Sequence, residues 1–521
     1  MQRITVGTGP LTEADVVSVA RDGTGVALST DASDAIAASR AIVDSLADDV
    51  EAHYGISTGF GALATKHIPP ERRALLQRSL IRSHAAGSGP EVEREVVRAM
   101  MLLRLSTLAT GHTGVRPQTA RTLAALIDGG ITPVVHEFGS LGCSGDLAPL
   151  AHVALALIGE GTVRDGSGEL QPAADALRSA GLEPVALAEK EGLALINGTD
   201  GMLGQLLLAC TDLDLLLRTA DVTAAMSVEA MLGTAQVFAA DLQMLRPQPG
   251  QAIAAANMRA LLAASPIVAS HAGPDCVYVQ DAYSMRCAPQ VAGAARDTLT
   301  HARTVAGYEL AAAVDNPVVL FATGEAGEAV ARVQSNGNFH GAPVAYVLDF
   351  LAIPAADLAS ISERRTDRML DASRSRGLPP FLADDPGVDS GHMIAQYTQA
   401  ALVSELKRLA NPASVDSIPS SAMQEDHVSM GWSAARKLRR SVDALTRVLA
   451  IELLTAARAL DLRAPLRPGP ATGAVVEALR ADVPGPGTDR FLAPEIEASV
   501  DFVRSGAAVA AAESGLGARL G

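Results

Sequence analysis

The chain has 521 residues, of which 48% are hydrophobic but only 3% aromatic, and its formal net charge is −16. A chain of this length can bury a large core and form two or three domains. The excess of 58 acidic over 42 basic residues repels phosphate backbones and anionic lipid surfaces. We therefore expect neither nucleic acid nor a membrane as a partner.

The cysteines and the N-terminus indicate a cytoplasmic protein with reduced thiols. The four cysteines form no CxxC pair, and the first residues lack the apolar core of a signal peptide. Apolar runs such as 206–210 are far shorter than the roughly 20 residues that a membrane span needs. No GK[ST] or HExxH motif occurs, and the eleven histidines are scattered, so the spacing predicts no metal site.

Alanine and leucine dominate the sequence, which predicts a core of helices packed on helices. We expect a mainly α fold in two domains. Residues 1–200 would form a smaller, mixed N-terminal domain that carries a reactive loop. Residues 201–521 would form a bundle of long helices.

Several features are predicted before that loop. Residues 3–6 and 25–28 favour short strands, separated by a turn-rich helix of modest strength, in a small hairpin or edge feature. Residues 29–53 favour the first long helix. The stretch 54–61 has three glycines in an apolar loop, which fits a surface loop as well as a functional one. His84 stands at a helix end, where a histidine is usually a cap or a packed side chain.

Helices are predicted over 93–110 and 117–129, and a hairpin that turns on Asp-Gly over 162–170. Between them, the stretch 139–150 has three glycines in seven residues, followed by a run that begins at Asp146 and includes a proline. This pattern predicts a tight loop that leads into a helix with Asp146 near its N-cap. A plain glycine-rich connector would show the same composition.

The tripeptide Cys143-Ser144-Gly145 gives this loop possible chemistry. If the fold compresses the loop, the Gly145 nitrogen, which no side chain hinders, can attack the carbonyl carbon of Cys143. Loss of water from that adduct and from the Ser144 side chain would leave 4-methylidene-imidazol-5-one. The protein would then carry a strong electrophile made from its own chain and would need no external cofactor.

Further polar motifs follow. Asn197-Gly198 alone indicates a turn. Gln280, Tyr283 and Arg286 stand at spacings of three, which would place them on one helical face, although a loop with an ion pair would fit as well. The Arg286 guanidinium is matched to a carboxylate, which an amino acid substrate must present.

The remaining segments include both long helices and isolated signals. Apolar helices are predicted over 206–218 and 222–232, with Asp221 and Gly233 bounding the second, and a long helix is predicted over 433–462. Phe339 by itself suits a core. The acidic and basic groups around Glu425 would usually be a solvated surface.

Residues 142–152, GCSGDLAPLAH, resemble the signature of the aromatic amino acid ammonia-lyases and aminomutases. From about residue 54 to about residue 462 the chain is similar to the histidine-specific members of actinobacterial type. The family's tripeptide is commonly Ala-Ser-Gly, whereas Cys143 leads here. Because the first residue supplies only backbone atoms to the ring, we expect cyclisation to survive, with a thiol beside the electrophile.

The resemblance implies roles for the polar motifs. Tyr54 would be the general base, provided that a cation or a dry pocket lowers the pKa of its phenol from about 10. Arg286 would anchor the substrate carboxylate, and Tyr283 would support both ring and substrate. The other residues placed around ring and substrate are Asn197, Gln280 and Phe339.

The resemblance also implies that two residues recognise the substrate side chain. His84 would face it, and Glu425 corresponds to a glutamate of histidine-specific members where the phenylalanine and tyrosine enzymes usually carry glutamine. A carboxylate can pair with imidazolium or accept its N–H more strongly than an amide does. His392 departs from the apolar residue expected there.

The implied reaction is elimination of ammonia from L-histidine to give trans-urocanate. It requires removal of a weakly acidic β-proton and expulsion of a poor leaving group, so that an electrophile, a base and a carboxylate anchor are all needed. The alternatives are a tyrosine or phenylalanine ammonia-lyase or 2,3-aminomutase, and a helical scaffold without ring or catalysis. The resemblance also implies a homotetramer whose sites each gather loops from three chains.

Overall fold

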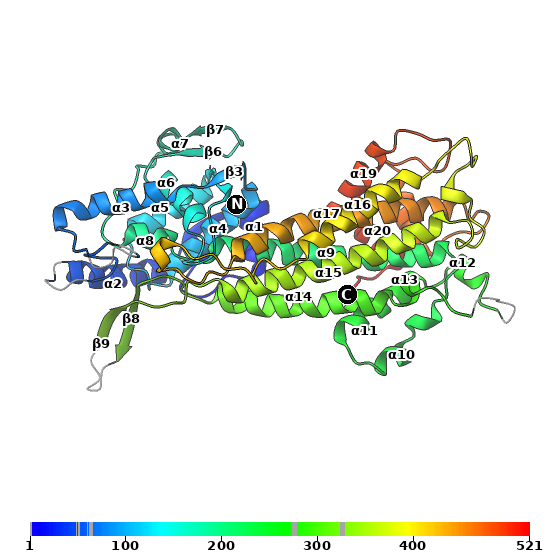
Figure 1. Cartoon of the computed structure of the whole chain (residues 1–521), viewed down its shortest axis with the longest axis horizontal. Coiled ribbons are helices and arrows are strands. Elements are labelled where there is room, and N and C mark those ends of the chain that lie inside the picture. The colour runs from blue at the N-terminus through cyan, green and yellow to red at the C-terminus, as the bar shows by residue number, and fades with distance from the viewer. Residues whose placement is uncertain are drawn as a thin grey trace. The chain divides into compact units, whose positions relative to one another are not determined.

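The computed structural model describes residues 3–47, 49, 53–59, 61, 66–273, 279–323 and 329–521 (Figure 1). The fold is mainly α with a few short strands, as predicted. Two compact units are present, and the first takes three separate stretches of chain, Met1–Leu208, Arg303–Leu348 and Pro412–Arg436. The second unit takes the intervening stretches and the C-terminus.

The first unit contains the mixed part of the fold. Its elements are β1 (Arg3–Val6), α1 (Glu13–Arg21), β2 (Gly25–Leu28), α2 (Thr30–Ala47), α3 (Pro70–His84), β3 (Ser88–Glu91), α4 (Arg94–Ala109), α5 (Pro117–Asp128), β4 (Thr132–Pro133), β5 (His136–Phe138), α6 (Leu147–Leu157), β6 (Thr162–Arg164), β7 (Leu170–Pro172), α7 (Ala173–Ser179), α8 (Glu191–Ile196), β8 (Val318–Thr323) and β9 (Ala329–Gln334). The β8–β9 hairpin, drawn in green at the lower left of Figure 1, was not predicted.

Four long helices contribute residues to both units, namely α9 (Asp200–Ala230), α14 (Ala288–Leu310), α15 (Ala342–Leu370) and α17 (Gly431–Asp461). The other helices of the second unit are α10 (Ala240–Met244), α11 (Pro249–Leu261), α12 (Pro266–Ala269), α13 (Tyr283–Arg286), α16 (Met393–Leu409), α18 (Pro470–Leu479), α19 (Ala493–Arg504) and α20 (Ala507–Leu516). The sequence places a domain boundary after residue 200, and the first stretch of the first unit ends at Leu208.

Strands β1 and β2 pair in parallel, so of the two expected forms the hairpin is wrong. Parallel strands need a crossover rather than a tight turn, and α1 provides it. Thr12 caps this helix, because its side chain accepts a hydrogen bond from the backbone N–H of Asp15 while the Asp15 carboxylate accepts one from the backbone N–H of Thr12. The hairpin predicted over 162–170 is confirmed, since β6 and β7 pair antiparallel.

Helix α9 runs without a break where two helices were predicted. Asp221 was expected at a boundary but lies inside this helix and is 1% exposed. Its carboxylate pairs with Arg296 (2.6 Å) and accepts a hydrogen bond from Asn257 (2.7 Å). A buried carboxylate with such partners is tolerated within a helix, so it does not act as a cap signal.

The core of the second unit includes a buried polar centre at Glu452 of α17, which is 0% exposed. Its carboxylate pairs with Arg365 of α15 (2.5 Å) and accepts hydrogen bonds from Ser227 of α9 (2.7 Å) and Ser362 of α15 (2.6 Å). The centre therefore joins three long helices in one arrangement. Loss of one partner from such a buried pair typically costs about 3–5 kcal/mol.

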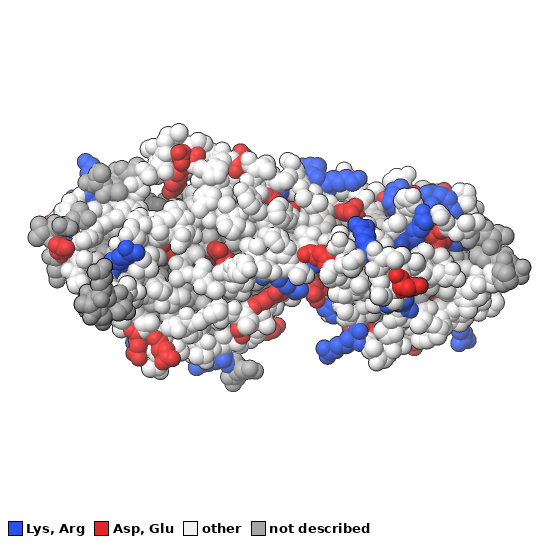
Figure 2. Space-filling model, turned by 90° about the horizontal axis from the view of Figure 1, so that it is seen from below, with Lys and Arg blue, Asp and Glu red and all other residues white. Residues whose placement is uncertain are grey.

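Among the described residues, α15 is long and apolar enough to cross a membrane by length and composition, but 61% of its apolar window is buried in the protein. A core helix passes the same test. Basic and acidic side chains both occur on the face drawn in Figure 2, and the sequence as a whole has acidic residues in excess. Within the first unit, α3 packs on α6 and α8, and these three helices frame the site.

Candidate active site

The predicted reactive loop lies between β5 and α6 and is pressed against a second loop. Gly145 has a φ of +73° and forms a bridge with Gly198. A Cβ at Gly145 would fall 2.0 Å from the Gly198 carbonyl oxygen, which also accepts a hydrogen bond from the Asp146 N–H (2.7 Å). Only glycine fits this position, so the chain around the tripeptide is both turned and compressed.

Two later segments hold the start of the loop. The Leu141 carbonyl accepts a hydrogen bond from the Met430 N–H (2.8 Å). The Gly142 carbonyl accepts one from the Ser429 hydroxyl (2.7 Å) and one from the Gly341 N–H (3.3 Å). The loop is therefore fixed by residues about 200 and 290 positions further along the chain.

The helix start predicted at Asp146 is confirmed, because α6 begins at Leu147. The Asp146 side chain does not bond to its own helix N-terminus. Its carboxylate accepts hydrogen bonds from the Ser140 hydroxyl (2.9 Å) and the Met202 N–H (2.8 Å). Complete burial raises the pKa of this carboxyl to about 7. Asp146 thus ties the reactive loop to the start of α9.

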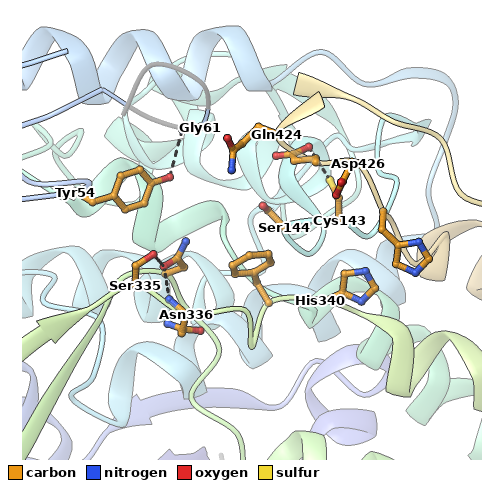
Figure 3. A pocket seen from close by; sticks show the side chains of 13 residues that line it. Tyr54, Gly61, Cys143, Ser144, Ser335, Asn336, His340, Gln424 and Asp426 are labelled. Carbon is orange, nitrogen blue, oxygen red and sulfur yellow. Dashed lines mark hydrogen bonds between the residues drawn. The ribbon is translucent and has the colours of Figure 1, made fainter. Parts of the chain in front are cut away.

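A first cavity of about 400 Å³ opens at the loop (Figure 3). Five predicted site residues line it, namely Tyr54, Cys143, Ser144, Phe339 and Glu425. Figure 3 shows the Tyr54 hydroxyl and the Ser144 side chain facing the same space, with Asn336 across from them.

A second cavity of about 780 Å³ shares Tyr54, Ser144 and Glu425 with the first. His84 and Asn197 add two more predicted site residues to its lining. The apolar part of its wall comes from Ile68, Leu76, Leu80, Leu147 and Leu193. Ser144 therefore lies where a polar space and a partly apolar space meet.

Tyr54 is the predicted base, and its electrostatic environment differs from the expectation. Burial raises the pKa of its phenol, because the charged phenolate loses hydration, and the negative charges of Glu425 and Asp315 raise it further. A hydrogen bond from the Gly61 N–H to the phenol oxygen (3.3 Å) acts in the opposite direction. The condition of a lowered pKa is therefore not met, and a dry pocket has the opposite effect on an acid, because it raises the pKa.

His84 ends α3 and lines the second cavity. Its Nδ1 lies 2.9 Å from the Leu80 carbonyl oxygen, so Nδ1 carries the proton and donates. Burial lowers the pKa of the imidazole, which favours the neutral ring. The neutral tautomer leaves Nε2 as a hydrogen-bond acceptor.

Asn197 is held from behind by a buried arginine. Arg104, which is 0% exposed, donates to the carbonyls of Asn197 (3.0 Å) and Ala194 (3.1 Å) and pairs with Asp200 (3.1 Å). The Asn197 amide donates to the Asn316 carbonyl (3.2 Å). Its Oδ1 is buried with no hydrogen-bond partner among the described residues. An acceptor in this state can receive a hydrogen bond from a ligand.

Gln280, Tyr283 and Arg286 belong to the second unit and line neither cavity. Helix α13 begins only at Tyr283, because Ala282 is extended, so Gln280 does not share its helical face as predicted. Tyr283 is 71% exposed, and the Arg286 guanidinium carbon lies 4.7 Å from the centre of its ring. This geometry permits a cation–π contact and leaves the tyrosine accessible.

The sequence interpretation missed several polar residues of the first cavity. Asn316 lines both cavities, and its Oδ1 accepts hydrogen bonds from the Ser335 hydroxyl (3.0 Å) and the Asn336 N–H (3.0 Å). Asn316 directly precedes Pro317, and the sequence assigned it no role at the site. Two adjacent polar residues, Asp315 and Asn316, between apolar segments and before the valines of β8 were the available signal.

His392, the departure from the family pattern, lies in the second unit and is 3% exposed. Its Nδ1 is 3.2 Å from the Thr455 hydroxyl. Burial and nearby arginines, Arg458 first among them, lower its pKa to about 3. The residue is thus a neutral core side chain. Among the described residues, no cluster of three or more His, Cys, Asp or Glu side chains could hold a metal ion.

Comparison with known proteins identifies the class. Residues 11–481 match the profile of the aromatic amino acid lyase family. The chain is 64% identical over 515 residues to a histidine ammonia-lyase of Streptomyces avermitilis, with 99% of both chains covered. The protein belongs to the aromatic amino acid lyase family, which confirms the resemblance seen in residues 142–152.

Solved structures agree in fold. The tyrosine aminomutase from Streptomyces globisporus is similar with a TM-score of 0.92 and 38% identity, and 100% of both chains is covered. A histidine ammonia-lyase from Trypanosoma cruzi is similar with a TM-score of 0.89 and 38% identity, covering 99% of this chain and 96% of that one. The fold therefore serves both elimination and amine migration, so substrate and outcome must be argued from the site.

Proposed function

We propose that this protein eliminates ammonia from L-histidine to give trans-urocanate and acts as a carbon–nitrogen lyase. The observation that carries the proposal is the position of Ser144, which lines both cavities beside Tyr54 and Glu425. The relative with 64% identity over nearly the full chain has this activity in its name. A cytoplasmic location fits the described cysteines, which are free thiols.

The electrophile proposed for the site is a methylidene-imidazolone formed from Cys143, Ser144 and Gly145. The residues fit this group, since the Gly145 nitrogen carries no hindering side chain and the loop is pressed onto Gly198. The unpartnered Oδ1 of Asn197 is an acceptor for a donor group of the substrate. Once formed, the group supplies an electron sink that makes ammonia easier to expel.

The chain's own residues supply the remaining needs of the reaction. Tyr54 removes the β-proton, and its phenolate is stabilised by the hydrogen bond from Gly61. His84 and Glu425 line the second cavity, and each offers an acceptor for an imidazole N–H. Phe339 lines the first cavity beside Ser144 and limits access of water to it.

A carboxylate anchor is supplied in this proposal by the second unit of another subunit. Gln280, Tyr283 and Arg286 line neither cavity of the first unit, yet they carry the donors that a carboxylate needs. A homotetramer in which each site gathers residues from three chains would complete the constellation. A protein that is a monomer in solution and still fully active would contradict this part of the proposal.

Intact mass and activity together test the proposal. Freshly purified protein should weigh less than its encoded sequence by two waters and should convert L-histidine to a product with urocanate absorbance. Ser144→Ala should abolish both the mass loss and the activity. Ser45→Ala is the matched control, because Ser45 is an exposed serine of α2 away from the cavities.

The same assay separates the alternatives. A tyrosine or phenylalanine lyase would release coumarate or cinnamate instead, and a 2,3-aminomutase would accumulate the β-amino acid. A non-catalytic scaffold would show neither the mass loss nor any turnover. Active wild-type protein with an unmodified tripeptide would overturn the proposed electrophile.

A further inference from the structure

Among the described residues, the carboxylate of Glu425 is held through its Oε2 oxygen. Oε2 accepts hydrogen bonds from the Cys143 thiol (3.2 Å) and from the Ser420 hydroxyl (2.9 Å). Among the residues that the structure describes, no hydrogen bond or ion pair reaches Oε1. Because Glu425 lines both cavities, its second oxygen is available to a bound molecule.

The Cys143 thiol is a dependable donor in this arrangement. Its side chain is 7% exposed, and burial together with the charge of Glu425 raises its pKa to about 12. The thiol therefore keeps its proton across the neutral and mildly alkaline range. Formation of the ring would use the carbonyl carbon of Cys143 and leave the thiol in place.

We propose that Cys143 is a positioning residue that, together with Ser420, fixes Oε2 of Glu425 and directs Oε1 toward an N–H of the substrate's imidazole ring. This inference rests on the proposed function, since it concerns recognition of histidine at the same site. A carboxylate can only accept hydrogen bonds, so its orientation matters for a ring that carries N–H groups. It matters far less for a phenyl ring, which has no such donor.

Fixing the carboxylate before the ligand binds reduces the conformational entropy that is lost on binding. A glutamate without anchors samples several rotamers, and ordering it would weaken ligand affinity. Cys143→Ala would remove one of the two hydrogen bonds to Oε2 and leave the one from Ser420. We therefore expect the first residue of the tripeptide to influence affinity for imidazole ligands although it adds no side-chain atom to the ring.

The test compares Cys143→Ala and Cys143→Ser in the full-length protein, each also combined with Glu425→Gln. Ring formation is followed by intact mass. Affinity is followed by KM for L-histidine and by inhibition constants for trans-urocanate and trans-cinnamate, which differ in carrying an imidazole or a phenyl ring. Cys143→Ala should keep the loss of two waters and raise both the KM and the urocanate constant about three- to tenfold, with a smaller change in kcat.

Selectivity and coupling decide the outcome. Cys143→Ala should change the inhibition constant for trans-cinnamate by less than about twofold, and Cys143→Ser should keep most of the wild-type affinity for urocanate. In the Glu425→Gln background, Cys143→Ala should raise the inhibition constant for urocanate by less than about a further twofold. Equal weakening of urocanate and cinnamate inhibition would indicate a merely structural effect and would overturn the inference. Unchanged urocanate inhibition in a ring-bearing Cys143→Ala protein would also overturn it.

Ser420→Ala provides a second, independent variant in case Cys143→Ala fails to fold or to form the ring. It removes the other anchor of Oε2 and should also weaken urocanate inhibition selectively. An unchanged urocanate constant in Ser420→Ala would contradict the shared anchoring. These outcomes are separate from the fate of the proposed function, which fails only if the wild-type protein lacks the ring or does not convert L-histidine.

Discussion

Gly145 and Gly198 approach each other so closely that a side-chain carbon on Gly145 would overlap the Gly198 carbonyl oxygen, at 2.0 Å. Gly145→Ala should therefore push the two loops apart and prevent ring closure. We expect the variant to keep its encoded mass, to lose activity and to lose about 1–3 kcal/mol of stability through overpacking and the positive φ. Intact mass and thermal melting measure these effects.

Gly168→Ala is a suitable control for that variant. Gly168 also has a positive φ, +90°, but in the β6–β7 turn no atom lies within 4 Å of the point that its added Cβ would occupy. This control should carry the backbone strain without the clash, so it should form the ring normally. A ring-bearing Gly145→Ala protein would contradict the need for close contact.

Tyr54→Phe should leave ring formation intact and lower kcat by about 10²- to 10⁴-fold, the usual contribution of a general base. Because burial and nearby carboxylates raise the phenol pKa above 10, the phenolate fraction should grow with pH throughout the neutral and alkaline range. The logarithm of kcat/KM should rise with a slope near one toward pH 10. Tyr308→Phe, at an exposed tyrosine of α14, should retain this profile.

His84→Leu should weaken recognition of the substrate ring. Loss of the Nε2 acceptor leaves an N–H of the substrate without its partner, which corresponds to about a 10- to 100-fold rise in KM for L-histidine. The ratio of turnover with L-phenylalanine to turnover with L-histidine should rise at the same time, because leucine suits a phenyl ring. Steady-state kinetics with both amino acids measures the change, and an unaltered ratio would remove His84 from the specificity role.

His392 should make the protein less stable in acid. Its pKa is about 3 in the folded chain, against an ordinary value of 6.5 in the unfolded chain. Between these pH values the unfolded state binds one more proton at His392 than the folded state does. The contribution of neutral His392 to the free energy of unfolding is therefore fully present above pH 6.5 and is lost as the pH falls toward 3. The loss is about 1.4 kcal/mol per pH unit, or roughly 2 kcal/mol at pH 5.

His392→Leu should flatten this dependence in urea unfolding measured at pH 7.5 and pH 5. The variant gives up the Thr455 contact, so its stability at pH 7.5 is not the diagnostic quantity; the difference between the two pH values is. His301→Leu replaces an exposed histidine and should keep the wild-type difference. An identical pH dependence in wild type and His392→Leu would show that His392 does not cause the loss of stability in acid.

The sequence predicted features that depend on local pattern and failed where distant partners decide. Helix α6 was predicted from an aspartate at its start and a proline in its first turn, which are local signals, although the Asp146 side chain does not cap the helix. Asp221 was misjudged because its partners, Arg296 and Asn257, come from other helices. A helix was expected between β1 and β2, but the local pattern of each strand does not indicate that the two strands pair in parallel.

The site shows the same division. The tripeptide and Glu425 were found through motifs, but the hydrogen bond between Cys143 and Glu425 joins residues 282 positions apart, and no pattern in either segment indicates it. The pKa of Tyr54 depends on burial and on carboxylates from two other loops, so a residue type could not give even its direction. Asn316 was missed because its role comes from contacts with Ser335 and Asn336.

The hold that Gly341, Ser429 and Met430 exert on the start of the reactive loop has a consequence for biosynthesis. The ribosome releases residue 145 long before these three residues are made. A nascent chain that stops before residue 429 would therefore carry Cys143, Ser144 and Gly145 as ordinary peptide. Maturation of the electrophile would then follow the synthesis of residues 429 and 430.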